Sequence, residues 1–462
     1  MDWRMRQRGV LTIAGALCAA LLAPAAAPAS TAAAAGASAS AWVPGEVVVR
    51  YEPGTSAAER AAIARRAGAR SARKLPGGAY RLRVAGGRSV GAVVAELRRD
   101  ERVASATPNY VARAAAFYPN DPGLGGLGEW QRLQWNFAGP WGVRAPDAWE
   151  LARLYGAPGG RGAVVAVIDT GLAYRNRGRY RRAPDFHPRR IMRGWDFVDD
   201  DRFPDDENGH GTHVAGTIAQ WTNNGTGLTG LAYGVKILPL RALDASGGGD
   251  SVAIARAIRY AVRKGADVIN LSLEFDNAQV RSATQIPEVV AALRLARRRR
   301  VVVVAASGNQ GRAAVAYPAR APYVISVGAT TEHGCGAAYA NTGPGLDLVA
   351  PGGGDDYTVS RPPDHPNDAH CPGAGGRTIY QQTFTSSLRR FGFPSGYEGT
   401  SMAAPHVSAA AALLIATKRL GSNPSPVAVE RRLKQTARDL GAPGTDARYG
   451  AGLLDAAAAL AP

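Results

Sequence analysis

The chain has 462 residues, 46% of them hydrophobic, so it can bury a sizeable core in up to three domains and is not mainly disordered. Its formal net charge of +18 would suit a nucleic-acid partner, but only five of its 55 basic residues are lysines. Together with an excess of alanine, this arginine bias indicates a compositional trend of the whole sequence, and we expect no nucleic-acid partner.

The first forty residues have the pattern of an export signal. Three arginines precede the apolar run Val10–Leu22, and the Ala/Ser/Pro-rich stretch after it offers A-x-A cleavage sites. This run is shorter than a membrane span of about 20 residues. Cys18 would suit a lipoprotein, but cleavage before it would split the apolar run. We therefore expect residues 1–39 to be a removed signal peptide and the protein to be secreted, with no membrane span.

Residues 42–113 are predicted to form a small α+β domain. The expected elements alternate between strand and helix in the order β-α-β-α-β. They are Glu46–Tyr51, Ser56–Ala67, Tyr80–Val84, Val90–Arg99 and Val103–Tyr110. A Pro/Gly/Asp-rich stretch at Tyr118–Gly128 then indicates a boundary.

Residues 118–462 show short, nearly continuous apolar runs, which are typical of strands buried on both faces of a parallel sheet. These runs are Val164–Ile168, Lys236–Leu240, Val268–Leu273, Val301–Ala305 and Val324–Val327. Helical patterns at Val252–Val262 and Ile286–Arg297 lie between them. The pattern predicts an α/β domain with a doubly wound, mainly parallel sheet sandwiched by helices, and a site at the carboxyl ends of its strands.

Three segments carry residues suited to nucleophilic catalysis. Val164–Gly171 is an apolar strand that ends in Asp169, Asn208–Thr217 contains His210, and Gly399–His406 contains Ser401 at the start of an Ala-rich stretch. Peptide hydrolysis needs a nucleophile, a base with a pKa near neutrality and a carboxylate that orients the base. Asp, His and Ser at turns beside strand and helix ends supply these parts.

These motifs, in the order Asp, His, Ser, resemble those of the subtilases, the subtilisin-like serine proteases, and within them the thermitase-like secreted branch. The resemblance covers residues 118–462. It implies that Ser401 is the nucleophile, that His210 is the general base and that Asp169 orients His210. His213 lies one helical turn on and is an alternative base; the motif favours His210 and leaves His213, like His406, a structural role.

The resemblance also extends to a fourth motif, which comprises Ala306, Ser307, Gly308 and Asn309. It implies that the Asn309 amide and the Ser401 backbone N–H form an oxyanion hole. A turn role is the alternative for such an Asn in a Gly-rich loop. The substrate is expected to bind as an added strand between two chain edges. The residues that match these edges are Gly247, Gly248, Gly249, Ser272, Leu273 and Glu274, and Ala306, Ser307 and Gly308 of the fourth motif are also expected to bind the substrate.

Glu274 departs from the family pattern, which has glycine at this position. We hypothesise that it shifts the preference of the primary pocket toward basic or polar residues. A side chain turned to solvent is the alternative.

Two oxygen-rich loops indicate structural calcium. The first is an acidic loop from Asp196 to Glu207, where mutual repulsion of carboxylates calls for a cation or solvent; the resemblance puts Asp196, Asp201 and Asp205 at ligand positions. The second set matches a family site built on the loop 222–228. Its members are Thr222, Asn224, Thr226 and Leu228, with carboxylates from Asp121 and Asp185. A solvated loop is the alternative in both cases.

After export the chain retains two cysteines, Cys335 and Cys371, which we expect to pair. The bridge would contribute about 3 to 4 kcal/mol by restricting the unfolded chain. Two buried free thiols are the alternative. The stretch Gly352–Glu398, which contains Cys371, is expected to be a loop near the site held by this disulfide.

The unit at residues 42–113 resembles a subtilase propeptide, a folding template and intramolecular inhibitor. The resemblance implies that the active site cuts it off between Tyr110 and Phe117.

The sequence thus predicts a secreted, monomeric serine endopeptidase that acts on proteins or peptides. A catalytically dead subtilase scaffold is the second hypothesis, and a lipase-like hydrolase is disfavoured because the Ser401 motif lacks the second glycine of G-x-S-x-G.

Overall fold

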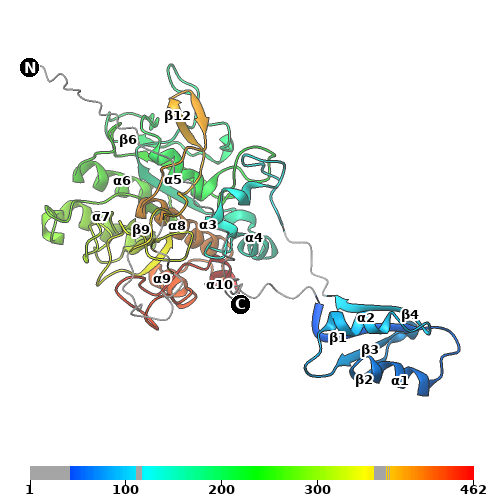
Figure 1. Ribbon diagram of the computed structural model, residues 1–462. Coiled ribbons are helices and arrows are strands. Elements are labelled where there is room, and N and C mark those ends of the chain that lie inside the picture. The colour runs from blue at the N-terminus through cyan, green and yellow to red at the C-terminus, as the bar shows by residue number, and fades with distance from the viewer. Residues whose placement is uncertain (1–41, 111–116, 358–370, 372, 374) are drawn as a thin grey trace, which may run out of the picture. The chain divides into compact units, whose positions relative to one another are not determined.

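The computed structural model describes residues 42–110, 117–357, 371, 373 and 375–462. The expected signal peptide and the junction at 111–116 lie outside the described residues. The chain divides into two compact units, residues 1–112 and 113–462, which Figure 1 shows in blue and in cyan to red. None of the helices described is long and apolar enough to cross a membrane.

The first unit is a four-stranded antiparallel sheet with two helices. Its elements are β1 (Trp42–Tyr51), α1 (Ala57–Arg66), β2 (Ala69–Lys74), the short 3-10 helix η1 (Pro76–Gly78), β3 (Tyr80–Val84), α2 (Val90–Leu97) and β4 (Val103–Tyr110), and the strand order is β2-β3-β1-β4. Ser56 caps α1 with a reciprocal capping box to Glu59. Residues such as Val47, Val93 and Leu97 pack between the helices and the sheet, with no exposed surface.

The strand β2 was not predicted. Its sequence, ARSARK, is rich in cations and has no apolar alternation. It lies at the edge of the sheet and pairs only with β3, and charged side chains are typical of edge strands because they discourage pairing with other chains.

The second unit contains a seven-stranded parallel sheet in the order β11-β10-β9-β8-β5-β7-β6. Its strands are β5 (Val164–Asp169), β6 (Trp195–Asp196), β7 (Lys236–Arg241), β8 (Val268–Leu271), β9 (Val302–Ala306), β10 (Ile325–Thr330) and β11 (Leu348–Pro351). The five predicted strands are confirmed, with ends that differ by one to three residues. The short strands β6 and β11 were not predicted. A separate hairpin follows, formed by β12 (Thr383–Ser387) and β13 (Arg390–Gly392).

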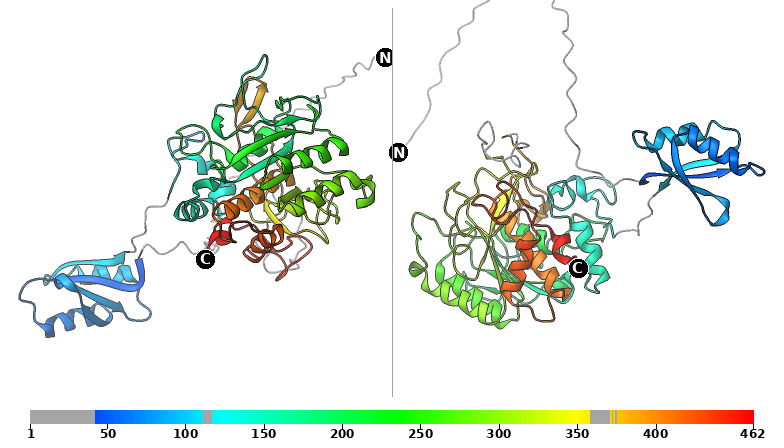
Figure 2. Two further views of the ribbon diagram at one scale, coloured as in Figure 1. Left: turned by 180° about the vertical axis from the view of Figure 1, so that it is seen from behind. Right: turned by 90° about the horizontal axis from the view of Figure 1, so that it is seen from below.

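Helices cover both faces of this sheet, as the predicted doubly wound fold requires. The helices are α3 (Trp135–Ala138), α4 (Ala145–Leu154), α5 (His210–Ala219), α6 (Ser251–Arg263), α7 (Pro287–Arg298), α8 (Thr400–Ala416), α9 (Pro426–Gln435) and α10 (Ala456–Leu460), with short 3-10 turns η2 (Trp130–Arg132), η3 (Pro158–Gly160), η4 (Pro188–Arg190) and η5 (Ala283–Gln285). Figures 1 and 2 show α6 and α7 side by side on one face, with α5 and α8 on the other.

The residues of β5 alternate between two cores. Val165 and Val167 pack with α5 and α8, whereas Ala166 and Ile168 pack with α6 and α7. All four side chains are buried, which explains why this strand is apolar throughout rather than at every second position.

Candidate active site

The candidate site lies at the point of the sheet where successive strands of the chain change from one side of β5 to the other. From β5 the chain passes to β6 and β7 on one side, and then returns to form β8 on the other side of β5. Loops that leave the carboxyl ends of β5 and β8 therefore diverge and open a crevice, the usual ligand position in such sheets. Asp169 is the last residue of β5, and Ser272 directly follows β8.

Asp169 and His210 are joined by a hydrogen bond of 2.7 Å between Oδ1 and Nδ1. The Asp169 side chain has no exposed surface, and its Oδ1 also accepts a 2.7 Å hydrogen bond from the Thr170 backbone N–H. An ionised carboxylate can only accept, so Nδ1 carries the proton and Nε2 is left as an acceptor. Burial lowers the pKa of His210, but the charge and the hydrogen bond of Asp169 outweigh it and hold this pKa above its ordinary value.

The preceding glycine sets the position of His210 at the start of α5. Gly209 has φ +105°, a conformation that favours glycine, and a Cβ there would lie 2.9 Å from Thr383 Oγ1. His210 is then the first helical residue, and 25% of its side chain is exposed. The Asn-Gly-His sequence thus turns the imidazole toward the crevice.

Asp206 accepts hydrogen bonds from the amino end of the same helix, α5. Its side chain is buried and accepts five hydrogen bonds of 2.6–3.0 Å. The donors are the backbone N–H groups of Asn208, Gly209 and Thr212 and the hydroxyls of Thr170 and Thr212. The negative charge also complements the amino end of α5 and contributes to the raised pKa of His210.

Ser401 is the second residue of α8. Its hydroxyl donates to the Ser272 carbonyl at 3.1 Å, and within the described part of the chain no hydrogen bond joins it to His210. Both side chains line one cavity of about 470 Å³. The Ser272 hydroxyl in turn donates to the Ser401 carbonyl at 2.7 Å, so β8 and the start of α8 are tied together at this point.

The Asn309 amide is oriented by Thr400. Its Oδ1 accepts from both the backbone N–H and the hydroxyl of Thr400, each at 2.9 Å. Because a backbone N–H can only donate, the oxygen must face Thr400 and Nδ2 must point away from it. The motif Gly399-Thr400-Ser401 therefore fixes the Asn309 amide as well as the serine.

Both predicted substrate edges line this cavity, one with Gly247, Gly248 and Gly249 and the other with Ser272, Leu273 and Glu274. Ala306, Ser307 and Gly308 are not among the residues that line this cavity. They end or follow β9 and are buried.

His213 and His406 lie in the core. His213 Nε2 donates to the Ile379 carbonyl at 3.0 Å, and its ring stacks on Tyr397 at 4.3 Å. Burial lowers the pKa of His213 to about 3 and that of His406 to about 4. His406 donates from Nδ1 to the Met402 carbonyl. These contacts support the packing role that the sequence analysis gave to both.

The structure brings together Asp121, Asp185 and the loop 222–228. Asp185 has no exposed surface, and its oxygens accept hydrogen bonds from Asn224 Nδ2 (2.8 Å), Gln220 Nε2 (2.6 Å) and Leu228 N (3.1 Å). Asp121, also fully buried, accepts from the backbone of the same loop. Burial raises the pKa of Asp185 to about 7. Two buried carboxylates beside the Asn224 amide are oxygen donors of the kinds that Ca²⁺ prefers.

The acidic loop does not fit a calcium ion in this way. Arg241 donates to Asp196 at 2.7 Å, and Arg177 donates to Asp205 at 2.9 Å. Asp201 accepts a backbone N–H within its own loop. Arginines therefore supply the positive charge that the sequence analysis assigned to calcium. Nor does any described group of three or more His, Cys, Asp or Glu side chains have an arrangement suited to a metal.

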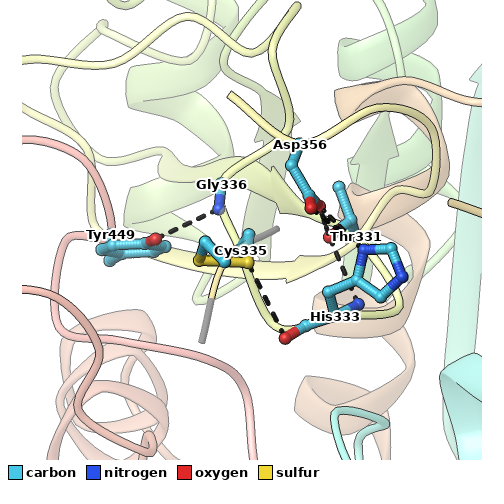
Figure 3. Close-up of a disulfide and its surroundings, with 7 residues drawn as sticks. Thr331, His333, Cys335, Gly336, Asp356 and Tyr449 are labelled. Carbon is cyan, nitrogen blue, oxygen red and sulfur yellow. Dashed lines mark hydrogen bonds and ion pairs between the residues drawn. A yellow bond between two sulfur atoms is a disulfide. The ribbon is translucent and has the colours of Figure 1, made fainter. Parts of the chain in front are cut away.

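Cys335 and Cys371 form a disulfide with a Cα–Cα distance of 5.7 Å, which confirms the predicted pair. Figure 3 shows Cys335 between Tyr449, whose hydroxyl binds the Gly336 N–H, and the hydrogen-bonded group of Thr331, His333 and Asp356. The bridge ties the loop after β10 to the stretch 352–398.

The end of that stretch lies against α5. Thr383 donates to the Gly209 carbonyl at 2.6 Å, directly before His210, and Tyr397 stacks on His213. Residues 358–370, 372 and 374 lie outside the described part.

Asp206, Thr400 and Asn270 support the site but were not predicted to do so. Asn270 donates to the Ser272 hydroxyl at 2.9 Å and accepts from Ser408 on α8 at 2.8 Å. Asp206 was counted as one carboxylate of the acidic loop. Its position four residues before His210, where it can accept from the helix end, was the available signal.

Comparison with known proteins identifies both units. Residues 160–452 match the model of the subtilase family, and residues 28–109 match that of the fervidolysin N-terminal prodomain. The chain is 34% identical over 410 residues to the thermophilic serine proteinase of Bacillus sp. (strain AK1), which covers 89% of this chain and 86% of that protein.

Two further proteins are similar to most of this chain. Thermitase of Thermoactinomyces vulgaris is 34% identical over 309 residues, 66% of this chain and 90% of its own. A solved protease from Pseudoalteromonas arctica is 31% identical, with a TM-score of 0.57 over 74% of this chain and 99% of its own. The chain belongs to the subtilase family of serine endopeptidases.

Proposed function

We propose that this protein is a secreted endopeptidase that hydrolyses peptide bonds of proteins through an acyl-enzyme on Ser401. The observation that carries the proposal is the 2.7 Å hydrogen bond between Asp169 and His210, together with the presence of His210 and Ser401 in one cavity. A neutral imidazole held at Nδ1 by a buried carboxylate presents Nε2 to a nucleophile.

The reaction begins with a rotation of the Ser401 side chain away from the Ser272 carbonyl toward His210. The Ser401 oxygen then attacks the carbonyl carbon of the scissile bond, and its proton passes to His210 Nε2. Asp169 stabilises the imidazolium that results. His210 next gives this proton to the departing amine. Water then attacks the ester carbonyl as His210 takes its proton, and His210 returns that proton to the Ser401 oxygen as it leaves.

Two N–H groups stabilise the negative charge on the substrate oxygen. One is Asn309 Nδ2, which Thr400 directs away from itself, and the other is the Ser401 backbone N–H in the first turn of α8, where intrahelical acceptors are lacking. The walls at 247–249 and 272–274 hold the substrate as an added strand.

The first unit acts as an intramolecular inhibitor, and cleavage between Tyr110 and Phe117 by the same active site releases it. Residues 1–39 direct export. The match of residues 28–109 to a prodomain supports this assignment.

Asp121, Asp185 and the loop 222–228 hold a structural Ca²⁺ ion. The ligands are Thr222, Asn224, Thr226 and Leu228, beside the two carboxylates. The ion supplies the positive charge that two buried carboxylates lack. We assign no ion to the acidic loop at Asp196, Asp201 and Asp205, because Arg241 pairs with Asp196 and Arg177 pairs with Asp205.

The test compares the wild type, Ser401→Ala and a matched control, Ser251→Ala, which removes a hydroxyl outside the cavity. The wild type and the control should cleave casein, react with a fluorophosphonate probe and lose their N-terminal unit. Ser401→Ala should remain full-length and unlabelled. Processing or labelling of Ser401→Ala at the wild-type level would overturn the proposal.

A further inference from the structure

Glu274 is a carboxylate inside the cavity that contains His210 and Ser401. It lies three residues beyond the end of β8 and lines the cavity with its neighbours Leu273 and Phe275. Its position relative to the nucleophile is fixed two residues earlier, where the Ser272 carbonyl accepts the Ser401 hydroxyl.

The Glu274 carboxylate reaches from this wall to the segment after β9. Its two oxygens accept hydrogen bonds from the Asn309 backbone N–H at 3.3 and 3.2 Å. A Cβ on Gly308 would lie 2.3 Å from Glu274 Oε2, so the carboxylate occupies the space beside that glycine. It therefore lies between the two segments, close to Gly308 and to the Asn341 side chain.

No cation is directly paired with this carboxylate. Within the described residues, no Arg, Lys or His nitrogen lies within 4.0 Å of Glu274, and Arg312, whose charge acts on Glu274 from further away, lies 3.9 Å from Asp276. Burial is the largest influence on the pKa of Glu274 and raises it, against the lowering effect of the Gln310 side chain, the Asn309 N–H and the charge of Arg312. A half-buried carboxylate without a directly paired cation gains much from an arriving cation, because a charge-assisted hydrogen bond is about twice as strong as a neutral one.

We propose that Glu274 selects substrates with Arg or Lys as the residue whose carbonyl is attacked. The inference rests on the proposed function of Ser401 and Asn309. A substrate carbonyl held between Ser401 and the Asn309 amide places the adjoining side chain beside the Asn309 backbone, where the Glu274 carboxylate lies. A guanidinium or ammonium group there pairs with Glu274 and replaces the weak hydrogen bonds to Asn309.

The test measures kcat/KM for a peptide series that differs only in the residue before the cleaved bond: Arg, Lys, Phe, Ala and Glu. The wild type should favour Arg and Lys over Phe. Glu274→Gln keeps the size of the side chain and removes the charge, and should lower the Arg-to-Phe ratio by about 10- to 100-fold, the value of one charged hydrogen bond. The matched control Glu288→Gln makes the same change at an exposed carboxylate that does not line the cavity, and should leave this ratio within about twofold.

A steric role gives a different pattern. If Glu274 only filled the pocket, Glu274→Gln would keep the wild-type profile, and only Glu274→Gly would admit Phe; that result overturns the proposal. A preference of the wild type for Phe or Ala over Arg also overturns it. Cleavage of none of the peptides, with no fluorophosphonate labelling, would instead refute the proposed function itself.

The processing junction offers an independent check. The sequence 111–116 is VARAAA, in which Arg113 is the one basic residue. Self-cleavage with the proposed preference gives a mature chain that begins at Ala114. The proposed preference is contradicted if the mature N-terminus lies elsewhere in this segment, is lost in Ser401→Ala and is unchanged when Arg113 is replaced.

Discussion

Replacement of Asp206 by alanine should destabilise the second unit severely. The carboxylate accepts five hydrogen bonds, and two of their donors are backbone N–H groups of the buried residues Gly209 and Thr212. Alanine cannot accept, and neither donor can turn away, because each belongs to the helix end. At about 1–3 kcal/mol for each unsatisfied buried donor, the free energy of unfolding should fall by about 2–6 kcal/mol.

Replacement of Asp206 by alanine should also change the pKa of the general base, His210. The charge of Asp206 contributes to the raised pKa of His210, so its loss should lower that pKa. His210 must be neutral to accept the serine proton, and it is neutral above its pKa. The acid limb of the plot of kcat/KM against pH should therefore move to lower pH, which a change in packing alone would not produce.

Stability is best measured by denaturant unfolding in a Ser401→Ala background, where self-digestion cannot occur, and the pH profile in the active chain. The control is Asp199→Ala in the same loop, whose side chain is 66% exposed and which should cost less than about 1 kcal/mol. A loss below about 1 kcal/mol for Asp206→Ala, with an unmoved acid limb, would refute the reasoning.

Three further predictions concern other parts of the second unit. Asn309→Ala should lower kcat about 10²–10³-fold, as the loss of one oxyanion donor does in a subtilisin, with little change in KM in steady-state assays. An unchanged kcat would exclude the Asn309 amide as an oxyanion donor. Replacement of Cys335 and Cys371 by serine should lower the free energy of unfolding by about 3 to 4 kcal/mol, and a reductant should then destabilise the wild type but not this variant. Chelation of calcium should lower the melting temperature, since an ion at 100 times its Kd contributes about 2.7 kcal/mol, and Asp185→Asn should lose this response; equal responses of the two would place the ion elsewhere.

The strands of the main sheet could be predicted because burial on both faces leaves a continuous apolar run, as in β5. Elements without such a pattern could not. The edge strand β2 is cationic and β6 has two residues, so each is defined by its neighbour in the sheet rather than by its own sequence. The strand β11 is apolar and buried, but its four residues end in proline, which is unfavourable inside a sheet.

The motif residues Asp169, His210 and Ser401 were predictable because each lies in a distinctive local sequence. Their supports were not, because the contacts are long-range. Arg241 lies 45 residues from Asp196 in the chain, and nothing in the local sequence of the acidic loop shows that a guanidinium reaches it. The carboxylates alone therefore suggested a metal where the fold provides arginine.

The use of arginine rather than a metal ion in the acidic loop affects the media in which the site keeps its structure. A bound ion is in equilibrium with its surroundings and leaves when they are depleted, whereas Arg241 and Arg177 are covalent parts of the chain and cannot be diluted away. The loop they neutralise runs directly into Asp206 and His210, so the approach to the base keeps its shape in media that strip divalent metals. We therefore expect a chelator to act at the proposed calcium site around Asp185.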